Sequence, residues 1–393
     1  MSRDDVNFDT IVIGAGIIGS SCAYHLAKSG RKTLLLEQYA LNHNMGGSHG
    51  GSRICRYTQI SPIYLPLIID AFKQWKELEK LAGEKLFIQN GLIWLDDKPN
   101  ETLHKSETLK RFSVKHQILK GKQIRQLFPH LHYDDEKWSG VYEPSAGILL
   151  ADKCLNAIHK QFLAIEGQIH DQERVVKINS GLNPSNETEV VTEKCIYKAK
   201  IVVVASGSWL DTLLPGLPIK VSPQLVGSYF WDIKDHAENF QAKLGSPSLI
   251  IDDGDDEIYM LPAVDYKDKI KFGVHLGVDT KNPSVREITA MPDSNVNVAR
   301  RHIARYLPDV DSRNPSVQPL CIYAMTSDQT MILDKHPKFP NIFLAGPMAG
   351  TGFKFGLTIG KIMTKMVNDD VIEFDLSPFK ITRKTALDVK SKI

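Results

Sequence analysis

The sequence has few cysteines, and no two of them stand at a spacing typical of redox or metal sites. Its 393 residues include 5 cysteines, and none belongs to a C-x-x-C motif. An odd number of cysteines without a secretion signal argues against a disulfide framework and favours a reducing compartment. Because no His, Cys or carboxylate cluster shows metal-ligand spacing, we expect no metal site.

An excess of charge and long apolar runs are also lacking. Lys and Arg total 48 against 46 Asp and Glu, a net charge of +2. This small excess of positive charge does not predict binding to nucleic acid or to an anionic membrane. The most apolar region, residues 10–27, is interrupted by Gly, Ser, Cys and Tyr, so it predicts a buried element rather than a membrane span. The polar, acidic start of the chain does not resemble a signal peptide.

What the sequence does contain is a complete βαβ pattern near its start. An apolar strand at residues 10–13 leads into a glycine-rich turn, a helix to about residue 29 and a second apolar strand at residues 33–36. The turn carries the pattern G-x-G-x-x-G, formed by Gly14, Gly16 and Gly19. In this strand–turn–helix context the pattern predicts a dinucleotide site.

Each residue of this motif has a physical task. Gly14 forms the tight turn, Gly16 admits a pyrophosphate to the backbone, and Gly19 lets helix and strand pack closely. The free N–H groups of the helix N-terminus favour the negative charge of the pyrophosphate. Glu37 follows Gly14 by 23 residues, and we expect it to accept hydrogen bonds from ribose hydroxyls. These residues alone do not distinguish NAD from FAD.

The middle of the chain predicts a second, β-rich domain. Short apolar runs follow one another between residues 222 and 277, which indicates a largely antiparallel sheet. Asn90-Gly91, within the apolar stretch 86–95, predicts a β-hairpin. A strand at 341–345 and a helix from about residue 353 to 367 then resemble the nucleotide domain again. We therefore expect a discontinuous nucleotide domain with the β-rich domain inserted into it.

Six stretches, in order across nearly the whole chain, carry a resemblance to a known family. They are GAGIIG at 14–19, GSHGGSRICR at 47–56, YEPSAGIL at 142–149, KFGVH at 271–275, CIYAMTSDQTMILDKHP at 321–337 and GFKFG at 352–356. With them the chain resembles the monomeric sarcosine oxidase group of FAD-dependent amine oxidases, and it is most similar to the peroxisomal sarcosine and L-pipecolate oxidases.

The resemblance implies an α/β fold of the glutathione-reductase type. A Rossmann-like FAD-binding domain would hold an inserted, mostly antiparallel β-sheet substrate domain. We assign residues 1–86, 145–219 and 321–393 to the first and residues 87–144 and 220–320 to the second. The implied activity is that of a monomeric oxidase, which converts a secondary amino acid such as sarcosine or L-pipecolate to an imine and reduces O₂ to hydrogen peroxide.

The resemblance also implies roles for residues around the flavin. Cys321 stands where the family's cysteine forms a thioether with the flavin 8α-methyl group, although a cysteine within a strand is more often a small core residue. Arg56 and Lys354 match the two cations that bind the substrate carboxylate, a task that suits the planar fork of a guanidinium. Tyr323 matches an active-site tyrosine on the substrate side, with core packing as the competing interpretation.

Lys271 and His275 lie four residues apart on an apparent strand, so both can face one flavin. By resemblance Lys271 promotes the reaction of reduced flavin with O₂, because a fixed positive charge stabilises developing superoxide. His275 matches a residue that contacts the substrate amine. Arg53 matches a basic residue over the flavin, and Tyr259 a second active-site tyrosine.

Three more residues complete the expected contacts to the cofactor: Ser48, Val175 and Gly350. Other positions depart from the family. Thr351 stands where histidine is frequent, the preceding Pro347-Met348-Ala349 differs from the usual Gly-Phe-Ser, and Gly50 replaces a residue that is sometimes histidine. Because this turn would lie over the flavin, the resemblance does not say which amino acid is the substrate.

Three alternatives remain open at this point. They are an FAD-dependent amino-acid dehydrogenase with a non-oxygen acceptor, a nicotinamide-dependent dehydrogenase, and a catalytically altered flavoprotein. The end of the chain adds an expectation about location. Ser391-Lys392-Ile393 differs from the peroxisomal address S-K-L only by Ile for Leu, which predicts recognition by a peroxisomal import receptor.

Overall fold

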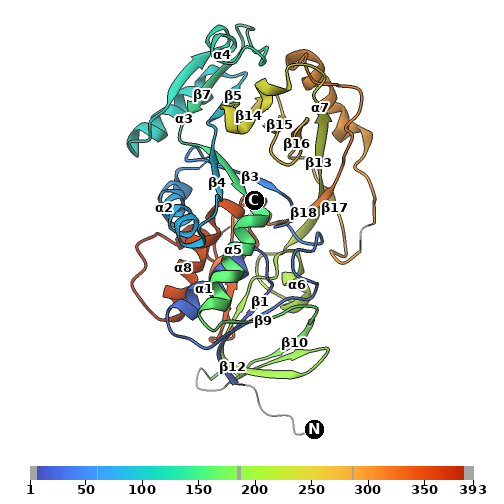
Figure 1. The fold of residues 1–393 in the computed structure, drawn as a ribbon. Helices are drawn as coiled ribbons and strands as arrows, with labels where there is room; N and C mark the ends of the chain where they lie inside the picture. Colours follow the sequence, from blue (N-terminus) through green and yellow to red (C-terminus); the bar gives the residue numbers. More distant parts are fainter. Residues whose placement is uncertain (1–6, 60, 184–186, 286, 385–393) are drawn as a thin grey trace, which may run out of the picture.

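The structure, a computed structural model, describes residues 7–59, 61–183, 187–285 and 287–384. Two large sheets and one small sheet form its framework. In Figure 1 the sheet that contains β1 and β12 occupies the lower half of the molecule, and the sheet that contains β14, β15 and β16 occupies the upper half. This α/β arrangement confirms the predicted fold class.

The lower sheet has eight strands and is built around the predicted βαβ unit. β1 is apolar and almost wholly buried, and parallel strands flank it on both sides, as expected for the centre of a layered sheet. The strands are β1 (Asn7–Ile13), β2 (Thr33–Leu36), β9 (Gln168–His170), β10 (Val175–Asn179), β11 (Thr188–Thr192), β12 (Ile196–Val204), β19 (Leu333–Lys335) and β20 (Ile342–Ala345).

The upper sheet has nine strands, and all of its neighbouring pairs are antiparallel except β5 with β14. The predicted antiparallel character is therefore confirmed. Its strands are β5 (Leu92–Asp96), β6 (Gln117–Lys120), β7 (Ser139–Glu143), β13 (Ser222–Asp232), β14 (Ser248–Asp253), β15 (Asp256–Leu261), β16 (Lys269–Val274), β17 (Val278–Asp279) and β18 (Leu320–Met325).

The predicted hairpin around Asn90-Gly91 is wrong. β4 (Phe87–Gln89) pairs with β8 (Gly147–Leu150) in a three-stranded sheet that also contains β3 (Ser52–Cys55). β5 begins only three residues after β4 but joins the upper sheet. The Asn90 side chain donates to the carbonyl of Ser246, at 2.7 Å, so this turn passes the chain from one sheet to the other.

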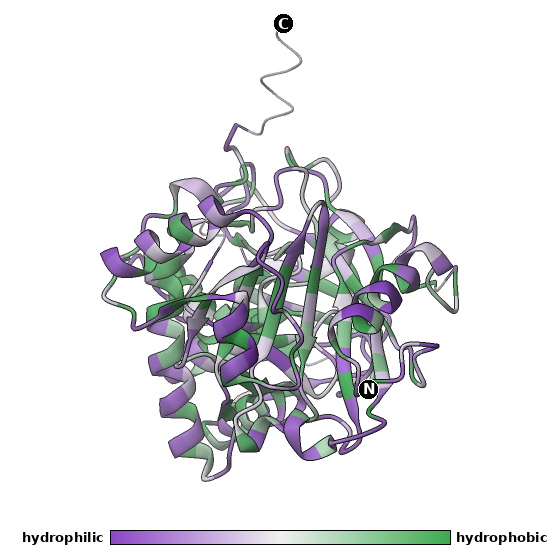
Figure 2. Ribbon diagram, turned by 90° about the horizontal axis from the view of Figure 1, so that it is seen from above, coloured by the Kyte–Doolittle hydropathy of each residue, from purple (hydrophilic) through white to green (hydrophobic). Residues whose placement is uncertain are grey.

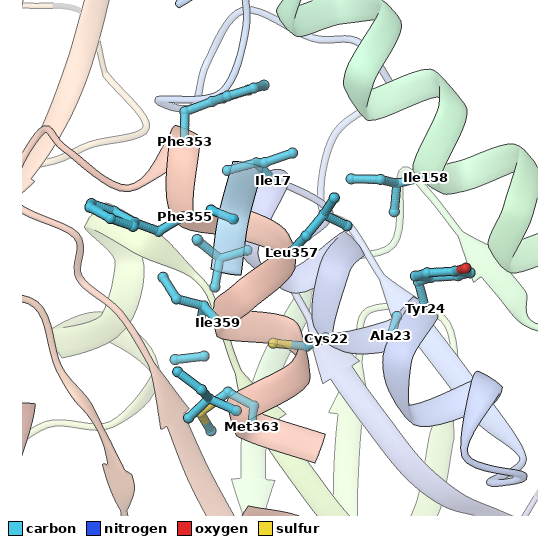
Figure 3. Close-up of a cluster of buried hydrophobic side chains, with 14 of the residues drawn as sticks. Ile17, Cys22, Ala23, Tyr24, Ile158, Phe353, Phe355, Leu357, Ile359 and Met363 are labelled. Carbon is cyan, nitrogen blue, oxygen red and sulfur yellow. The ribbon is translucent and has the colours of Figure 1, made fainter. Parts of the chain in front are cut away.

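Helices cover the lower sheet and enclose its hydrophobic core. Figure 3 shows side chains of α1 and α8 facing each other, with Ile158 of α5 beside them. The helices with the lower sheet are α1 (Ile17–Lys28), α2 (Leu65–Ala82), α5 (Ala151–Ala164), α6 (Leu210–Leu213) and α8 (Gly356–Val367). Those packed on the upper sheet are α3 (Pro99–Arg111), α4 (Gly121–Leu127) and α7 (Asp293–Tyr306). Figure 2 shows hydrophobic residues along the central strands and many hydrophilic residues on the outer helices.

The proposed domain bounds stay a prediction, although one of them does not coincide with a sheet boundary. Residues from 321 onward were assigned to the FAD-binding domain, whereas β18 pairs along its length with β13 of the upper sheet. All five cysteines are free. Among the helices that the structure describes, none is long and apolar enough to cross a membrane.

Candidate active site

One large cavity is lined by residues of both large sheets. Its volume is about 1030 Å³, at the upper end of the ~300–1,000 Å³ typical of small-molecule sites. Figure 1 places β3 and β18, which contribute to its wall, near the middle of the molecule. The predicted site residues in this wall are Gly14, Gly16, Glu37, Ser48, Arg53, Arg56, Val175, Tyr259, Lys271, His275, Cys321, Tyr323, Gly350 and Lys354.

The glycine-rich turn forms one end of the cavity. Gly14 has φ +101°, a left-handed conformation that disfavours other residues. Gly19 lies outside the cavity wall, and a Cβ atom there would stand 1.8 Å from the carbonyl oxygen of Gly14. Because Gly19 has no Cβ atom, α1 can begin directly against the turn, as the motif predicts. The N–H groups at the start of α1 therefore reach the cavity, where they can bind an anion.

Glu37 and Ser48 hold this turn in place. The Glu37 carboxylate accepts from the backbone N–H groups of Ala15, at 2.8 Å, and Tyr39, at 3.0 Å. Burial would raise its pKa, but hydrogen bonds from His43 and these two N–H groups outweigh burial and lower the pKa. The Ser48 hydroxyl accepts from the N–H of Ile17 at 3.0 Å. An ionised carboxylate thus lies beside the α1 N-terminus, in reach of a bound dinucleotide.

Arg56 and Lys354 are two cations at another part of the cavity, where Lys354 is buried and Arg56 is half-buried. Arg56 follows β3 and donates to the carbonyl of Thr58, and the Lys354 ammonium donates to the carbonyl of Thr351 at 3.1 Å. Burial, together with the positive charge of Arg56, lowers the pKa of Lys354 to about 7. Burial also lowers the pKa of Arg56 to about 10. Neither residue forms an ion pair with a carboxylate in the part of the chain that the structure describes, so the pair can receive an anion.

Lys271 provides a third buried cation. It belongs to β16, is 6% exposed, and donates to both the carbonyl and the hydroxyl of Ser52 at 3.3 Å. Burial lowers its pKa to about 8, and the positive charge of Arg53 acts in the same direction. Arg53 is itself fixed by hydrogen bonds to backbone carbonyls of the glycine-rich loop, among them that of Ser52 at 2.8 Å.

Three rings line the wall near these cations. The centroids of Tyr259 and His275 lie 5.2 Å apart, and the Tyr323 hydroxyl lies 3.4 Å from Nδ1 of His275. His275 is open to the cavity but enclosed by protein, and this enclosure lowers its pKa to about 4, with contributions from Arg56 and Lys354. The imidazole is therefore neutral at neutral pH. A Cβ atom at Gly273 would lie 2.1 Å from the Tyr259 ring, so this glycine makes room for the ring.

Cys321 lies on β18 opposite Val226 of β13, and its half-buried side chain belongs to the cavity wall. Val175, the first residue of β10, lies at the wall together with Glu37. A Cβ atom at Gly350 would lie 2.9 Å from the Tyr323 ring, so Gly350 shapes the wall beside that tyrosine. All three residues lie in the cavity wall, and their contacts with the flavin stay a prediction.

Sequence reasoning missed Glu143 and Asp265. Glu143 is fully buried and accepts from the N–H groups of Tyr57 and Thr58, so it shapes the segment that follows Arg56. Its position within the YEPSAGIL stretch was the available signal. Asp265 accepts from the Ser52 hydroxyl, beside Lys271. No sequence pattern marked Asp265, because the contact joins residues 213 positions apart.

The cavity suits a long ligand with a pyrophosphate and a planar ring system. A glycine cradle and a helix N-terminus lie at one end, and buried cations and aromatic rings lie elsewhere in the same space. The family model described as FAD dependent oxidoreductase matches residues 9–366. The chain belongs to this family. FAD is therefore the cofactor of this oxidoreductase, and the alternative of a nicotinamide-dependent dehydrogenase is wrong.

Similar proteins indicate to which group within this family the chain belongs. The oxidoreductase is 34% identical to human peroxisomal sarcosine oxidase over 97% of both chains. It is 28% identical to monomeric sarcosine oxidase of Bacillus sp. strain NS-129, over 96% of this chain and 97% of the relative. It therefore belongs with the sarcosine oxidase group of FAD-dependent amine oxidases, as the sequence motifs predicted.

Solved structures agree on the fold. Glycine oxidase from Geobacillus kaustophilus has a TM-score of 0.79 at 18% identity, covering 97% of this chain and all of that one (100%). NikD, an amino acid oxidase of nikkomycin biosynthesis, has a TM-score of 0.80 at 19% identity, over 95% and 97% of the two chains. Within the residues that the structure describes, no group of three or more His, Cys, Asp or Glu side chains could hold a metal ion.

Proposed function

We propose that this amine oxidase oxidises a small secondary amino acid, such as sarcosine or L-pipecolate, to an imine and reduces O₂ to hydrogen peroxide. The observation that carries the proposal is that half-buried Arg56 and buried Lys354 both reach the cavity and form no ion pair with a carboxylate among the described residues. Two cations held close together in a poorly hydrated wall are costly unless an anion joins them. An amino-acid carboxylate meets this requirement.

The surrounding groups orient the rest of the substrate. The guanidinium of Arg56 offers parallel N–H donors to one carboxylate, and Lys354 adds a point charge. The neutral imidazole of His275 and the hydroxyl of Tyr323 then lie where they can contact an unprotonated amine. Such an arrangement restricts the substrate to one orientation, and orientation is a large source of rate.

The chemistry itself belongs to the cofactor. The bound FAD would supply the redox chemistry, in which the substrate loses the C–H bond next to nitrogen and the N–H proton as the C=N bond forms, and the two electrons and two protons reach O₂ to give hydrogen peroxide. Glu37, Ser48 and the glycine turn hold the ADP half, and Arg53, Val175 and Gly350 contribute further contacts. Lys271 holds a positive charge beside the site, where it stabilises negative charge that develops on oxygen.

Two further parts of the proposal concern attachment and location. Cys321 is the residue that would form a thioether with the 8α-methyl group of the flavin, because its side chain reaches the cavity. Ser391-Lys392-Ile393 would direct the enzyme to the peroxisome, as the name of the human relative suggests. These three residues lie outside the described part of the structure.

A substrate screen tests the proposed function. Sarcosine, L-pipecolate and L-proline are added in turn to the holoenzyme without oxygen, and the visible flavin absorbance is followed. We expect at least one of them to bleach the flavin, and oxygen to restore the colour with release of hydrogen peroxide. Bleaching without reoxidation by O₂ would instead support the dehydrogenase alternative. An absence of bleaching by every secondary amino acid would contradict the proposal.

A further inference from the structure

We propose that Trp94 and Asp252 are positioning residues for Arg56, and that they set the affinity of the site for the substrate carboxylate. The inference rests on the proposed role of Arg56 in binding that carboxylate. Trp94 is 3% exposed and is not part of the cavity wall, so it can act only through a neighbour.

The indole ring of Trp94 lies against the Arg56 guanidinium. The guanidinium carbon stands 4.4 Å from the ring centroid, within the range of a cation–π contact. In the described structure Arg56 donates one hydrogen bond to the protein, to the carbonyl of Thr58. The ring therefore restrains the position of the guanidinium, while N–H groups remain for a carboxylate.

Asp252 fixes the ring in turn. The indole N–H of Trp94 donates to the Asp252 carboxylate at 2.8 Å. The same oxygen accepts from the Lys105 ammonium at 3.2 Å, and Lys105 also pairs with Asp96. The Lys105 ammonium stands 4.6 Å from the centroid of the Trp94 ring, so the indole contacts two cations, Arg56 and Lys105.

The sheet register places these groups on one face. Trp94 stands opposite Ile250, and Asp96 opposite Asp252, in the pairing of β5 with β14. Residues two apart on a strand share a face, so Trp94, Asp96 and Asp252 all point the same way. Lys105 reaches this face from α3. Ile250 belongs to the cavity wall, and this sheet face therefore continues from the site to the buried charges.

A positioning role explains why charges are buried here. Asp96 is 1% exposed and Lys105 is 9% exposed, and such a pair contributes little net stability compared with apolar residues. The network does supply a negative charge behind Arg56. Asp252, like Glu143, raises the pKa of Arg56 against the effect of burial. A guanidinium that is held in position and charged binds a carboxylate at a smaller entropic cost.

The test measures binding of acetate, an unreactive carboxylate, to the holoenzyme by the change in its visible flavin absorbance. Acetamide, an uncharged molecule of the same shape, serves as the control ligand. We expect Trp94→Leu to weaken acetate binding about tenfold, because it removes the cation–π contact, and to leave acetamide binding unchanged. Trp94→Phe keeps an aromatic face and should restore most of the affinity. Asp252→Asn should weaken acetate binding several-fold.

Asp253→Asn is the matched control on the same strand. Asp253 points to the opposite face, where it accepts from the Lys137 ammonium at 2.9 Å. Acetate affinity should be unchanged in this variant. If Trp94→Leu and Asp252→Asn bind acetate as tightly as the original enzyme, or if Asp253→Asn weakens binding equally, the positioning role is refuted. Should Trp94→Leu fail to fold, Asp252→Asn decides by the same criterion.

The outcomes also separate this inference from the proposed function. If the unaltered enzyme binds acetate no better than Arg56→Ala does, the carboxylate site itself is refuted. If Arg56→Ala abolishes acetate binding but the changes at Trp94 and Asp252 do not weaken it, only the positioning role fails.

Discussion

At the scale of single residues, the site is defined by cations that burial has perturbed. Burial lowers the pKa values of Lys354, Lys271 and Arg56, and each of these residues reaches the same cavity. Strongly perturbed ionisable groups in one cleft are typical of functional sites. Their separate positions suggest separate tasks: Lys354 lies with Arg56, whereas Lys271 lies with Ser52 and Arg53.

The first prediction concerns the carboxylate clamp. Arg56→Ala and Lys354→Met should each raise the KM for amino-acid substrates by on the order of 10- to 100-fold, because each removes a hydrogen bond to a charged group. Steady-state kinetics with sarcosine and L-pipecolate measure the effect. Unchanged KM values in both variants would remove these residues from substrate binding.

The second prediction concerns Lys271 and its pH dependence. Lys271→Met should slow reoxidation of the reduced enzyme by O₂ on the order of 100-fold, with a much smaller effect on anaerobic reduction. Because the lowered pKa is about 8, the ammonium is charged below this pH and neutral above it. The rate of reoxidation should therefore fall as the pH rises through about 8. Stopped-flow measurement of both half-reactions tests this, and equal slowing of the two would contradict the oxygen role.

The third prediction concerns flavin attachment. Cys321→Ser cannot form the thioether, so all of its FAD should appear in the supernatant after acid precipitation. The unaltered enzyme should retain a yellow pellet. Cys195→Ser, at a half-buried cysteine outside the cavity wall, is the control and should also retain the colour. Flavin that stays in the Cys321→Ser pellet would refute the assignment.

At the scale of elements, the close packing of α8 on α1 sets the position of Lys354. Lys354 belongs to the short helical turn Phe353–Phe355 directly before α8. Glycines at 356 and 360 let α8 approach α1, since a Cβ atom at Gly360 would lie 2.5 Å from the carbonyl oxygen of Ser21. Figure 3 shows side chains of the two helices facing each other, among them Cys22 of α1 and Ile359 of α8.

The fourth prediction follows from this packing. Gly360→Ala should force α8 away from α1 and destabilise the enzyme by about 1–3 kcal/mol, as overpacking does in other cores. It should also raise the substrate KM, because Lys354 moves with the helix. Thermal unfolding and steady-state kinetics measure the two effects. An unchanged melting temperature together with an unchanged KM would show that the contact relaxes locally.

At the scale of the whole molecule, the cavity joins segments that are distant in the sequence. Its wall contains the first glycine turn, strands of the upper sheet and the turn before α8. A ligand that contacts all of these segments in the folded chain and none of them in the unfolded chain must stabilise the fold.

The fifth prediction tests this coupling. Cys321→Ser enzyme stripped of its FAD should unfold at a lower temperature than the same variant with FAD restored. At a free FAD concentration of one hundred times its Kd, the gain is about 2.7 kcal/mol. Calorimetry over a series of FAD concentrations gives the dependence. A melting temperature that does not depend on FAD would mean that the cofactor bridges fewer segments than the cavity wall implies.

Much of the fold followed from local patterns in the sequence. The bounds of the βαβ unit were predicted to within a few residues. Its apolar strands, its glycine turn and the glycine that ends its helix are all signals carried by neighbouring residues of one short segment. The hairpin at Asn90-Gly91 failed for the complementary reason. The turn signal was present, but the two strands that flank it find their partners in different sheets. Local turn chemistry cannot report which distant strand completes a pair.

The sequence was therefore sufficient for the cofactor and the family. All of its predicted site residues except Gly19 lie in the cavity wall, although most residues of that wall were not predicted. Motifs carry this information because each motif residue contacts a neighbouring residue or the ligand. The roles of Trp94, Asp252 and Glu143 became visible only in three dimensions. Each of them acts through a partner many positions away. Burial, which lowers the pKa of Arg56 and Lys354, is likewise a property of the assembled chain.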